Sequence, residues 1–471
     1  MPLIIPSNSI SAGGYEVDNS LRFDDGSSDY LYRTFTTPTN NKIFTWSGWV
    51  KRGSIGTSSS QNFLRTNGAT SDGIRFADQS IDGNLDGIRI FFNNSTSGDL
   101  NTTQKFRDVS AWYHIVLSVD TTQATASDRV KLYINGEQVT SFNTETYPAL
   151  NHTPKLNSAT QHNIGTHQGN EIFDGYMSEV VFIDGQQLDP TSFGEFDEDS
   201  GIWKPIDVSG LTFGTNGFYL DFENSGSLGA DVSGNSNNFT VNNLTSIDQT
   251  TDTPTNNFAT LNPLSTVHTE NISSMLSNGN VDYSPSGDYS IVKSNIPFGT
   301  TGKWYVEAKI NTTPGGSGGL GVQRLPATSY STNSYLSYQC NDYCYSYQGG
   351  GKIAKGSASS TTVASGLEVF TAGDIIAMLF DADNNEIKWY NNDTLIYTLD
   401  LSTAPDGYYI NDGEWVFAYM GYSGNGTINI NFGNPTITIS SGNSDANGYG
   451  NFEYSTKDGY ALNTKNLAEY G

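Results

Sequence analysis

Two cysteines, Cys340 and Cys344, lie in the tyrosine-rich stretch YLSYQCNDYCYSYQGGGK (335–352) and are the only cysteines in the 471-residue chain. A structural zinc site needs four ligands, but there is no second cysteine pair, and all five histidines lie far upstream. A redox motif would read Cys-x-x-Cys on a βαβ pattern, whereas the spacing here is Cys-x-x-x-Cys. A hairpin turning at Asn341-Asp342 would bring the two cysteines close, so a small disulfide-closed loop and two buried or half-buried thiols both remain open.

The tyrosines around the cysteines suit two different roles. In an extended strand Tyr343, Tyr345 and Tyr347 share one face. That face either packs inside a sandwich or forms an exposed platform for a sugar ring or a partner chain, because tyrosine has an apolar face and a polar tip. The Gly- and Ser-rich flanks favour a position at a sandwich tip, where Lys355 can contact an anionic glycan. The candidate ligand-binding residues are Tyr335, Tyr338, Tyr343, Tyr345, Tyr347 and Lys352.

Two acidic stretches superficially resemble calcium loops. DADNNEIKW (381–389) has the alternating oxygen residues, but Glu386 stands at the sixth position where a calcium loop has glycine, and Asp393 stands at the twelfth where it has Glu. A strand-to-strand turn is therefore favoured, although calcium stays a weak possibility there and in DVSGNSNN (231–238). The chain has no Gly-x-Ser-x-Gly, no His-Glu-x-x-His and no phosphate-binding glycine loop. No carboxylate pair stands out for glycoside cleavage, so we expect no enzyme, no cofactor and no metal.

The charge balance excludes several partners. The chain has 23 Lys and Arg against 49 Asp and Glu, a net charge of −26, which argues against nucleic acid and anionic lipid. The opening MPLIIPSNSISAGGYEVDNS lacks a basic region followed by a long apolar run, and no stretch reaches the roughly 18 apolar residues of a membrane span. We expect no membrane insertion. The low cysteine content predicts folding in a reducing cytoplasm.

The patterning predicts strands throughout. Aromatic residues make up 12% of the chain and charged residues only 15%, which favours pleated sheets over helices. NKIFTWSGWVKRG (41–53) and GKWYVEAKI (302–310) alternate in hydrophobicity. Asn135-Gly136 in RVKLYINGEQV predicts a type I′ hairpin turn. In LDPTSFGEF (188–196), Asp189 as N-cap and Pro190 at the first position predict a short helical turn.

A weak internal sequence similarity indicates how the chain divides into domains. RVKLYINGEQV (129–139) resembles EIKWYNNDTLI (386–396), and each follows an apolar strand that ends in Asp. Two antiparallel β-sandwiches of similar architecture are the simplest explanation. The predicted boundaries are an N-terminal arm (1–17), a first sandwich (18–205), a Ser-, Thr- and Asn-rich connector (206–262) pinned by Leu244, Ile247 and Phe258, a second sandwich (263–440) and a C-terminal segment (441–471) packed on one of them.

The order of several segments resembles one family of proteins. FTWSGWVKRG, AWYHIVLSVDTT, RVKLYINGEQV and FDGYMSEVVFIDGQQLDPTSFGEFDEDSGIWKP resemble a laminin-G/concanavalin-A-like domain found in bacteriophage virion proteins. GKWYVEAKI, GDIIAMLFDADNNEIKWYNN and INFG resemble a SPRY domain, and NFEYSTKDGYALNTKNL matches the usual ending of these phage chains. The resemblance covers most of residues 18–467. It is weakest over 313–370, the stretch that contains the cysteines.

This resemblance implies an all-β fold of two concanavalin-A-like antiparallel β-sandwich (jelly-roll) domains. It also implies a non-enzymatic protein on the virion surface, a tail fibre or receptor-binding adhesin that recognises host glycan or protein. The alternative is a head fibre, decoration or tail-machine subunit docked on other virion proteins, for which the apolar start MPLIIP would serve as an anchoring arm. By analogy we expect a homo-oligomer, a trimer. One departure is Asn391-Asn392-Asp393 where the family usually shows Asn-Gly, which predicts a longer or differently shaped turn.

Overall fold

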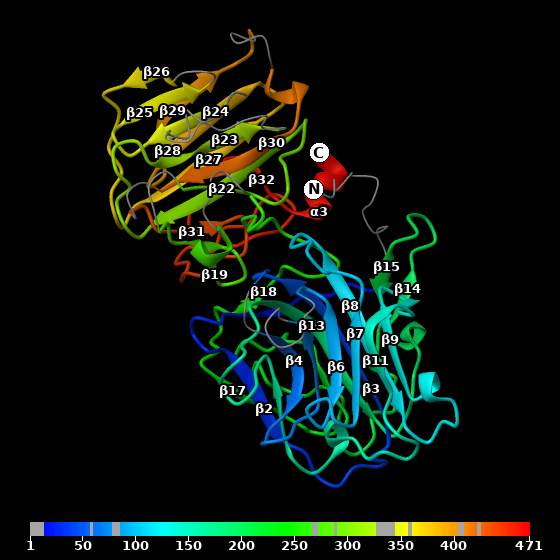
Figure 1. Ribbon diagram of the computed structural model, residues 1–471. Helices are drawn as coiled ribbons and strands as arrows, with labels where there is room; N and C mark the ends of the chain where they lie inside the picture. Colours follow the sequence, from blue (N-terminus) through cyan, green and yellow to red (C-terminus); the bar gives the residue numbers. More distant parts are fainter. Residues whose placement is uncertain are drawn as a thin grey trace. The chain divides into compact units, whose positions relative to one another are not determined.

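A computed structural model describes residues 14–471 except 57–59, 78–84, 266–271, 287–289, 326–343, 357–359, 404–408 and 422–424. Within these residues the fold is nearly all β, with a single α-helix (Figure 1). The described chain divides into two compact units, the first ending at Thr255 and the second starting at Asn256. The predicted fold class is confirmed: antiparallel sheets form two sandwiches.

The first unit contains two eight-stranded sheets. The first sheet has the order β10 (Glu137–Gln138), β9 (Val130–Ile134), β8 (Trp112–Asp120), β3 (Ile43–Arg52), β13 (Gly175–Asp184), β1 (Ser20–Phe23) and β18 (Gln249–Thr250), with β16 (Phe218–Leu220) also paired to β13. The second has the order β11 (Phe142–Thr146), β7 (Gly98–Thr102), β6 (Ile88–Phe92), β5 (Gly73–Phe76), β4 (Gln61–Thr66), β12 (Gln161–Ile164), β2 (Tyr30–Thr34) and β17 (Thr240–Asn242).

Facing side chains of these two sheets form one core. Trp46 of β3 stacks on Phe63 of β4 with ring centroids 6.0 Å apart, and both are fully buried. A small two-stranded sheet joins β14 (Gly194–Phe196) to β15 (Trp203–Pro205). Short 3-10 turns are η2 (Ala126–Asp128), η3 (Lys155–Asn157) and η4 (Pro190–Ser192). The helical turn predicted at 188–196 is confirmed, because the Asp189 side chain accepts a hydrogen bond from the Thr191 amide at the start of η4.

The second unit also contains two sheets. The eight-stranded sheet has the order β19 (Leu276–Ser277), β20 (Asp282–Tyr283), β31 (Ile428–Asn431), β22 (Lys303–Ile310), β27 (Ile375–Asp381), β28 (Glu386–Asn391) and β29 (Thr394–Asp400), with β32 (Tyr460–Ala461) paired in parallel to β22. The six-stranded sheet has the order β21 (Ile291–Lys293), β30 (Trp415–Met420), β23 (Gly319–Arg324), β24 (Cys344–Gln348), β25 (Lys352–Gly356) and β26 (Ser360–Ser365).

The core of the second unit lies between these sheets. It includes Trp304, Val306 and Ala308, which share one face of β22 as the alternation predicts. The described 3-10 turns are η5 (Ile272–Met275) and η6 (Ile410–Asp412), and the α-helix is α3 (Thr464–Tyr470), capped by the Asn463 side chain. Because β32 joins the sheet of β22, the segment 441–471 packs on the second sandwich.

The structure differs from the predicted domain boundaries at the connector. Residues 206–255 contribute β16, β17 and β18 to both sheets of the first unit instead of linking two sandwiches. Leu244 is buried in the first core, Ile247 is half-buried, and Phe258 is buried in a cluster of the second unit. Short strands at sheet edges need only two or three paired residues, so the polar composition of this segment does not prevent it from joining the sheets.

The turn between β28 and β29 also differs from the prediction. Asn391 pairs with Thr394, which leaves two turn residues, Asn392 (φ 44°) and Asp393 (φ 70°). Positive φ at both positions is the type I′ geometry, and asparagine and aspartate adopt it more readily than other non-glycine residues. The prediction of a longer or differently shaped turn is therefore wrong.

Candidate functional site

The structure places the two described tyrosines of the predicted site inside the second sandwich. Tyr345 is 2% exposed and Tyr347 is 0% exposed, and both belong to the core. Tyr345 stacks near Trp415, with centroids 6.0 Å apart, and the Tyr347 hydroxyl donates to the Glu368 carbonyl at 2.5 Å. The strand β24 is central in its sheet, so its apolar face meets the core. For these two rings the exposed-platform prediction is corrected in favour of the packed face.

The other predicted site residues give less structural information. Tyr335, Tyr338, Tyr343 and Cys340 lie outside the described residues, so their roles stay predictions. Lys352 begins β25 and is exposed. Cys344 is buried in β24, and the two alternatives, a disulfide with Cys340 and two separate thiols, both stay predictions.

Both stretches that resemble calcium loops form turns. The Asp381 carboxylate accepts hydrogen bonds from the backbone and side-chain nitrogens of Asn384 at 3.0 and 2.9 Å. The Asp231 carboxylate accepts from the amides of Tyr219, Ser233 and Asn237 at 2.7–2.9 Å. These oxygens are used to close the turns. Among the described residues no group of three or more His, Cys, Asp or Glu side chains is arranged to hold a metal ion.

A largely polar set of side chains lies on the outer face of the second sheet in the first unit, and most of them are buried. Here Ile74, Ile88 and Ile90 point into the core, so the alternate residues point outward. Two rows of paired residues cross the strands on this face. The first row is Asn62, Arg75, Arg89 and Asn101, and the second is Asn163, Arg65, Gly73, Phe91 and Asp99. Three of the 23 basic residues are thus concentrated on one sheet face.

Phe91 lies among the three arginines of these rows. The guanidinium carbons of Arg65 and Arg75 are each 5.1 Å from its ring centroid, and that of Arg89 is 5.6 Å away. Gly73 makes this arrangement possible, since a Cβ there would meet the Phe91 ring at 2.9 Å. Cations over an aromatic face are mutually stabilising. The arginines are therefore held in place from the sheet side.

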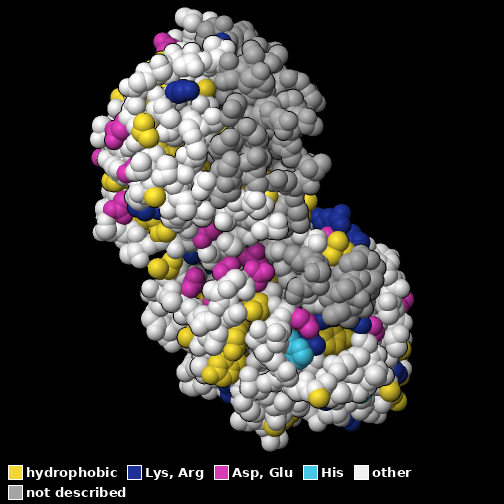
Figure 2. Space-filling view, turned by 60° about the vertical axis from the view of Figure 1, so that its left-hand side comes forward, with side chains coloured by type: hydrophobic (Ala, Val, Ile, Leu, Met, Phe, Trp, Pro, Cys, Tyr) yellow, Lys and Arg dark blue, Asp and Glu magenta, His cyan; other side chains and the backbone are white. Residues whose placement is uncertain are grey.

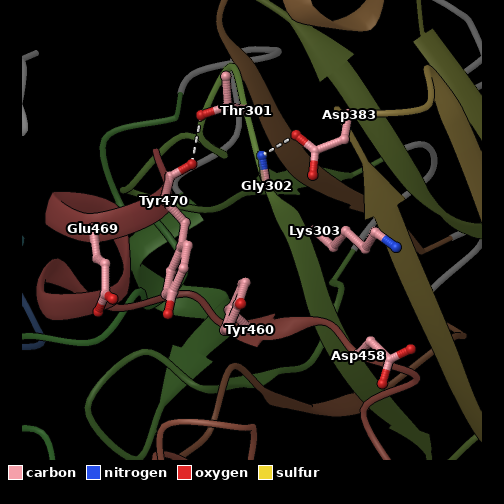
Figure 3. Close-up of a pocket in the computed structure, with 8 residues that line it drawn as sticks. All are labelled: Thr301, Gly302, Lys303, Asp383, Asp458, Tyr460, Glu469 and Tyr470. Carbon is pink, nitrogen blue, oxygen red and sulfur yellow. Dashed lines mark hydrogen bonds between the residues drawn. The ribbon is translucent and has the colours of Figure 1, made fainter.

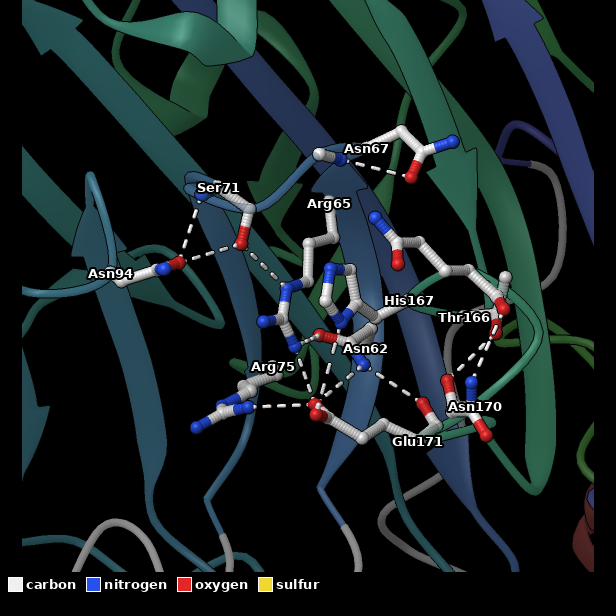
Figure 4. A network of polar contacts seen from close by, with 12 residues as sticks. Asn62, Arg65, Asn67, Ser71, Arg75, Asn94, Thr166, His167, Asn170 and Glu171 are labelled. Atoms are coloured by element: carbon white, nitrogen blue, oxygen red, sulfur yellow. Dashed lines mark hydrogen bonds and ion pairs between the residues drawn. The ribbon is translucent and has the colours of Figure 1, made fainter.

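A hairpin, residues 165–171, lies against this face (Figure 4). His167 and Asn170 pair across its tip, where Gln168 and Gly169 have positive φ. The Asn62 side chain donates to the Glu171 carbonyl at 2.8 Å. The Glu171 carboxylate accepts from Arg65 and, at 2.9 Å, from Arg75. We call Asn62, Arg65, Arg75, His167 and Glu171 the Glu171 network.

The charges of this network fix the state of its carboxylate. Burial by itself would raise the pKa of Glu171, but the hydrogen bond with His167 and the charges of Arg65 and Arg75 outweigh it and lower the pKa to about 2. Glu171 is therefore ionised at physiological pH. Its side chain is 25% exposed and that of His167 is 20% exposed, whereas Arg65 and Arg75 are 8% and 4% exposed.

Two further polar atoms at this face have unused hydrogen-bonding capacity. Asn163 Nδ2 and His167 Nε2 are buried and have no hydrogen-bond partner among the described residues. Asn163 is 1% exposed and pairs across the strands with Arg65. Buried polar groups are normally satisfied by protein or water, and these two atoms are too buried to contact a ligand at the surface directly. Figure 2 shows a histidine side chain at the surface beside acidic and basic side chains.

The sequence contained an unused signal for this surface. Gly-Ile-Arg occurs twice, at 73–75 and 87–89. Each copy places an arginine on the outer face of one of two neighbouring strands, and the pairing of β5 with β6 sets Arg75 opposite Arg89. The hairpin partner, Glu171, lies about a hundred residues further along the chain, and no local pattern points to it.

Comparison with known proteins agrees with the fold of this unit. Residues 25–188 match the family model of the concanavalin A-like lectin/glucanases superfamily, and the Glu171 network lies within these residues. A comparison with curated proteins finds no match.

Several solved structures are similar to parts of the chain. A putative carbohydrate binding protein from Bacteroides ovatus shares 17% identity over 48% of this chain, with a TM-score of 0.33, and the chain covers 59% of that protein. The SPRY domain of human HERC1 shares 17% identity over 32% of this chain and 85% of its own, with a TM-score of 0.24. Domains LG4-5 of mouse laminin alpha1 share 8% identity over 92% of this chain and 93% of theirs, with a TM-score of 0.29.

In the part of the chain that the structure describes, no helix is long and apolar enough to span a membrane.

Proposed function

We propose that the chain is a non-enzymatic adhesin whose first unit binds a glycan at the Glu171 network. The observation that carries this proposal is a preorganised set of polar side chains on the outer sheet face of a concanavalin A-like sandwich. Ligand sites use a few precisely placed polar groups to fix the orientation of the ligand. Phe91 and the arginines are buried and support the site, and the hairpin supplies the accessible groups.

Solvent exposure separates the residues that support the site from those that can contact a glycan. Arg65 and Arg75 are almost fully buried and hold Glu171 from below. The Glu171 carboxylate and the His167 ring reach solvent, as do the exposed side chains of Gln168 and Asn170 at the hairpin tip. A carboxylate accepts two hydrogen bonds from neighbouring hydroxyls, and the amides both donate and accept. Vicinal sugar hydroxyls match this set.

The substitution Glu171→Gln tests the site. It keeps the shape of the side chain but removes the charge that both arginines bind, so the hairpin loses its strongest tether and the hydroxyls lose a charged acceptor. We expect glycan affinity to fall about tenfold, equivalent to roughly 1.4 kcal/mol. The measurement is binding of the purified chain, displayed on beads, to a glycan array.

Glu137→Gln is the matched control, because Glu137 is exposed in β10 and lies in the other sheet. It should leave binding unchanged. If Glu171→Gln binds the glycan as strongly as the unsubstituted chain, the Glu171 network is not the binding site. If the chain displayed on beads binds no glycan on the array, the proposal of a glycan-binding adhesin is wrong.

The biological setting we propose is the surface of a bacteriophage particle, assembled in the host cytoplasm. The segments of this chain follow one another in an order that resembles phage virion proteins, which supports this setting. The low cysteine content also supports it. The partners would be other virion proteins and a host surface glycan or protein, with three copies of the chain in one fibre. Many copies on one particle would raise weak single-site affinity by effective concentration.

An adsorption assay separates the adhesin from the alternative function. Cells pre-incubated with the purified chain should resist adsorption of the phage that encodes it. Normal adsorption, together with detection of the chain in purified particles, would instead favour a head fibre, decoration or tail-machine subunit.

A further inference from the structure

The second unit has a surface pocket of about 450 Å³ that is unrelated to the Glu171 network (Figure 3). Four segments line it: the turn before β22 (301–303), the turn between β27 and β28 at Asp383, residues 458–460 around β32, and the end of α3 at 469–470. All four belong to the second unit.

Hydrogen bonds hold the walls of this pocket together. The Thr301 hydroxyl donates to the Tyr470 carbonyl at 2.5 Å, which ties the turn before β22 to the end of α3. The Gly302 amide donates to the Asp383 carboxylate at 2.8 Å, which ties the same turn to the β27–β28 turn. Tyr460 pairs with Trp304 across parallel strands. A site whose walls are already fixed loses little entropy when a ligand binds.

Two tyrosines form an aromatic wall of the pocket. The rings of Tyr460 and Tyr470 stack with centroids 3.9 Å apart and planes 7° apart. Trp304, which is fully buried, lies 6.4 Å from Tyr460 and supports it from the core. Both tyrosines are half-buried, so each combines a supported ring with an accessible edge or face. Tyrosine in this state presents an apolar surface and a hydroxyl to the same ligand.

The rim of the pocket is acidic. Asp383, Asp458 and Glu469 are exposed carboxylates around it. The single basic residue of the lining, Lys303, has its ammonium 3.6 Å from the buried Asp381 carboxylate. A negative rim repels uronates and sulfates but accepts hydrogen bonds from hydroxyl groups. The charge therefore selects against anionic sugars.

We propose that this pocket binds one uncharged pyranose unit of a glycan. A ring of that size presents an apolar face to the Tyr460–Tyr470 wall and its hydroxyls to Asp383, Asp458 and Glu469. The site lies in a different unit from the Glu171 network, so each of the two sites can be tested without the other.

Saturation-transfer NMR on the full chain tests this site with methyl glycosides of glucose, galactose and mannose and with methyl glucuronide. At least one neutral glycoside should bind, and Tyr470→Ala should weaken it about tenfold. Tyr409→Ala, at an exposed tyrosine of the same unit outside the pocket lining, is the matched control and should have no effect. Methyl glucuronide should not bind this pocket. Any saturation-transfer signal that it gives should therefore be the same in the unsubstituted chain and in Tyr470→Ala.

A second variant guards against simple loss of folding. Asp458 has φ 63°, a conformation that asparagine readily adopts, so Asp458→Asn should keep the backbone. It should weaken neutral-sugar binding several-fold, because a charged acceptor becomes a neutral one. Unchanged binding in both variants, or Tyr470-dependent binding of glucuronide as strong as that of the neutral glycosides, would overturn the proposal. So would neutral-sugar binding that Glu171→Gln abolishes and Tyr470→Ala does not, which would assign the ligand to the first unit alone.

Discussion

At the residue scale, Glu179 stands out as a buried acid in a strained position. It lies in the bulge of β13 between Ser178 and Val181 and has φ 51°, a conformation that is costly for a residue with a side chain. Its carboxylate accepts hydrogen bonds from Tyr219 at 2.6 Å and Tyr15 at 3.2 Å. Burial raises the pKa of Glu179 to about 7, although both tyrosine hydrogen bonds oppose the rise.

This pKa predicts a pH-dependent stability with a definite sign. In the unfolded chain the group has its ordinary pKa of 4.5, so between pH 4.5 and about 7 only the folded state holds the proton. Stability must then fall as pH rises through this window, by at most about 1.4 kcal/mol per pH unit. Above pH 7 both states are ionised and the loss is complete.

Glu179→Gln tests the prediction, because it mimics the protonated acid. We expect the melting temperature of the variant minus that of the unsubstituted chain to increase from pH 4.5 to about 7 and then to level off. Glu137→Gln, at an exposed position, should show no such trend. A difference that is constant with pH would contradict a proton held by Glu179 in the folded state.

Residue-scale function was the hardest feature to predict from the sequence. For the tyrosines of 335–352, composition shows which side chains are present but not which face of a strand meets the core. The ring of Tyr347 packs in the core, and its buried hydroxyl donates a hydrogen bond to the Glu368 carbonyl. Only the folded chain brings this partner near. The Glu171 network was missed because His167 and Glu171 meet the arginines through long-range pairing.

At the element scale, the predicted hairpin at Asn135-Gly136 is confirmed and offers a clear test. Asn135 has φ 49° and Gly136 has φ 83°, the type I′ pattern between β9 and β10. A Cβ on Gly136 would also meet the Trp203 ring at 2.4 Å. That indole is fixed, because its nitrogen donates to His114 at 2.9 Å.

Gly136→Ala should therefore destabilise the chain by about 2–4 kcal/mol, since backbone strain adds to a steric clash. Gly234→Ala is the matched control: Gly234 has φ 90° but nothing within 4 Å of an added Cβ, so only the backbone cost of about 1 kcal/mol applies. Urea unfolding measures both. Equal losses in the two variants would mean that Trp203 moves aside at no cost.

Elements were predicted well wherever periodicity is strong. The alternation in 41–53 and 302–310 corresponds to β3 and β22, and the internal sequence similarity corresponds to the triplets β8–β9–β10 and β27–β28–β29, which form the same antiparallel meander at a sheet edge. The two-residue turn at Asn392-Asp393 is an exception, because it forms without a glycine. Asparagine and aspartate tolerate positive φ well enough to preserve the turn.

At the scale of the whole molecule, three short strands are not visible in the alternation of the sequence. β16, β17 and β18 have two or three residues each, too few for an alternation to show, and they lie in a segment rich in Asn, Thr and Ser. Their backbone pairing with β13, β2 and β1 joins residues 206–255 to the first unit. The composition correctly indicated sheet structure but placed the domain boundary too early.

The net charge of −26 predicts how the whole chain responds to salt. Like charges repel in the compact state more than in the expanded unfolded chain, and raising sodium chloride from about 0.01 to 0.15 M shortens the screening length from roughly 30 to 8 Å. The melting temperature at pH 7.5 should therefore rise over this range. Near pH 4.3, the isoelectric point, the same addition should give no rise, because the net repulsion is absent. A lower melting temperature in salt at pH 7.5 would show that exposed ion pairs, such as Lys131–Asp128 and Lys457–Asp393, outweigh the excess of negative charge.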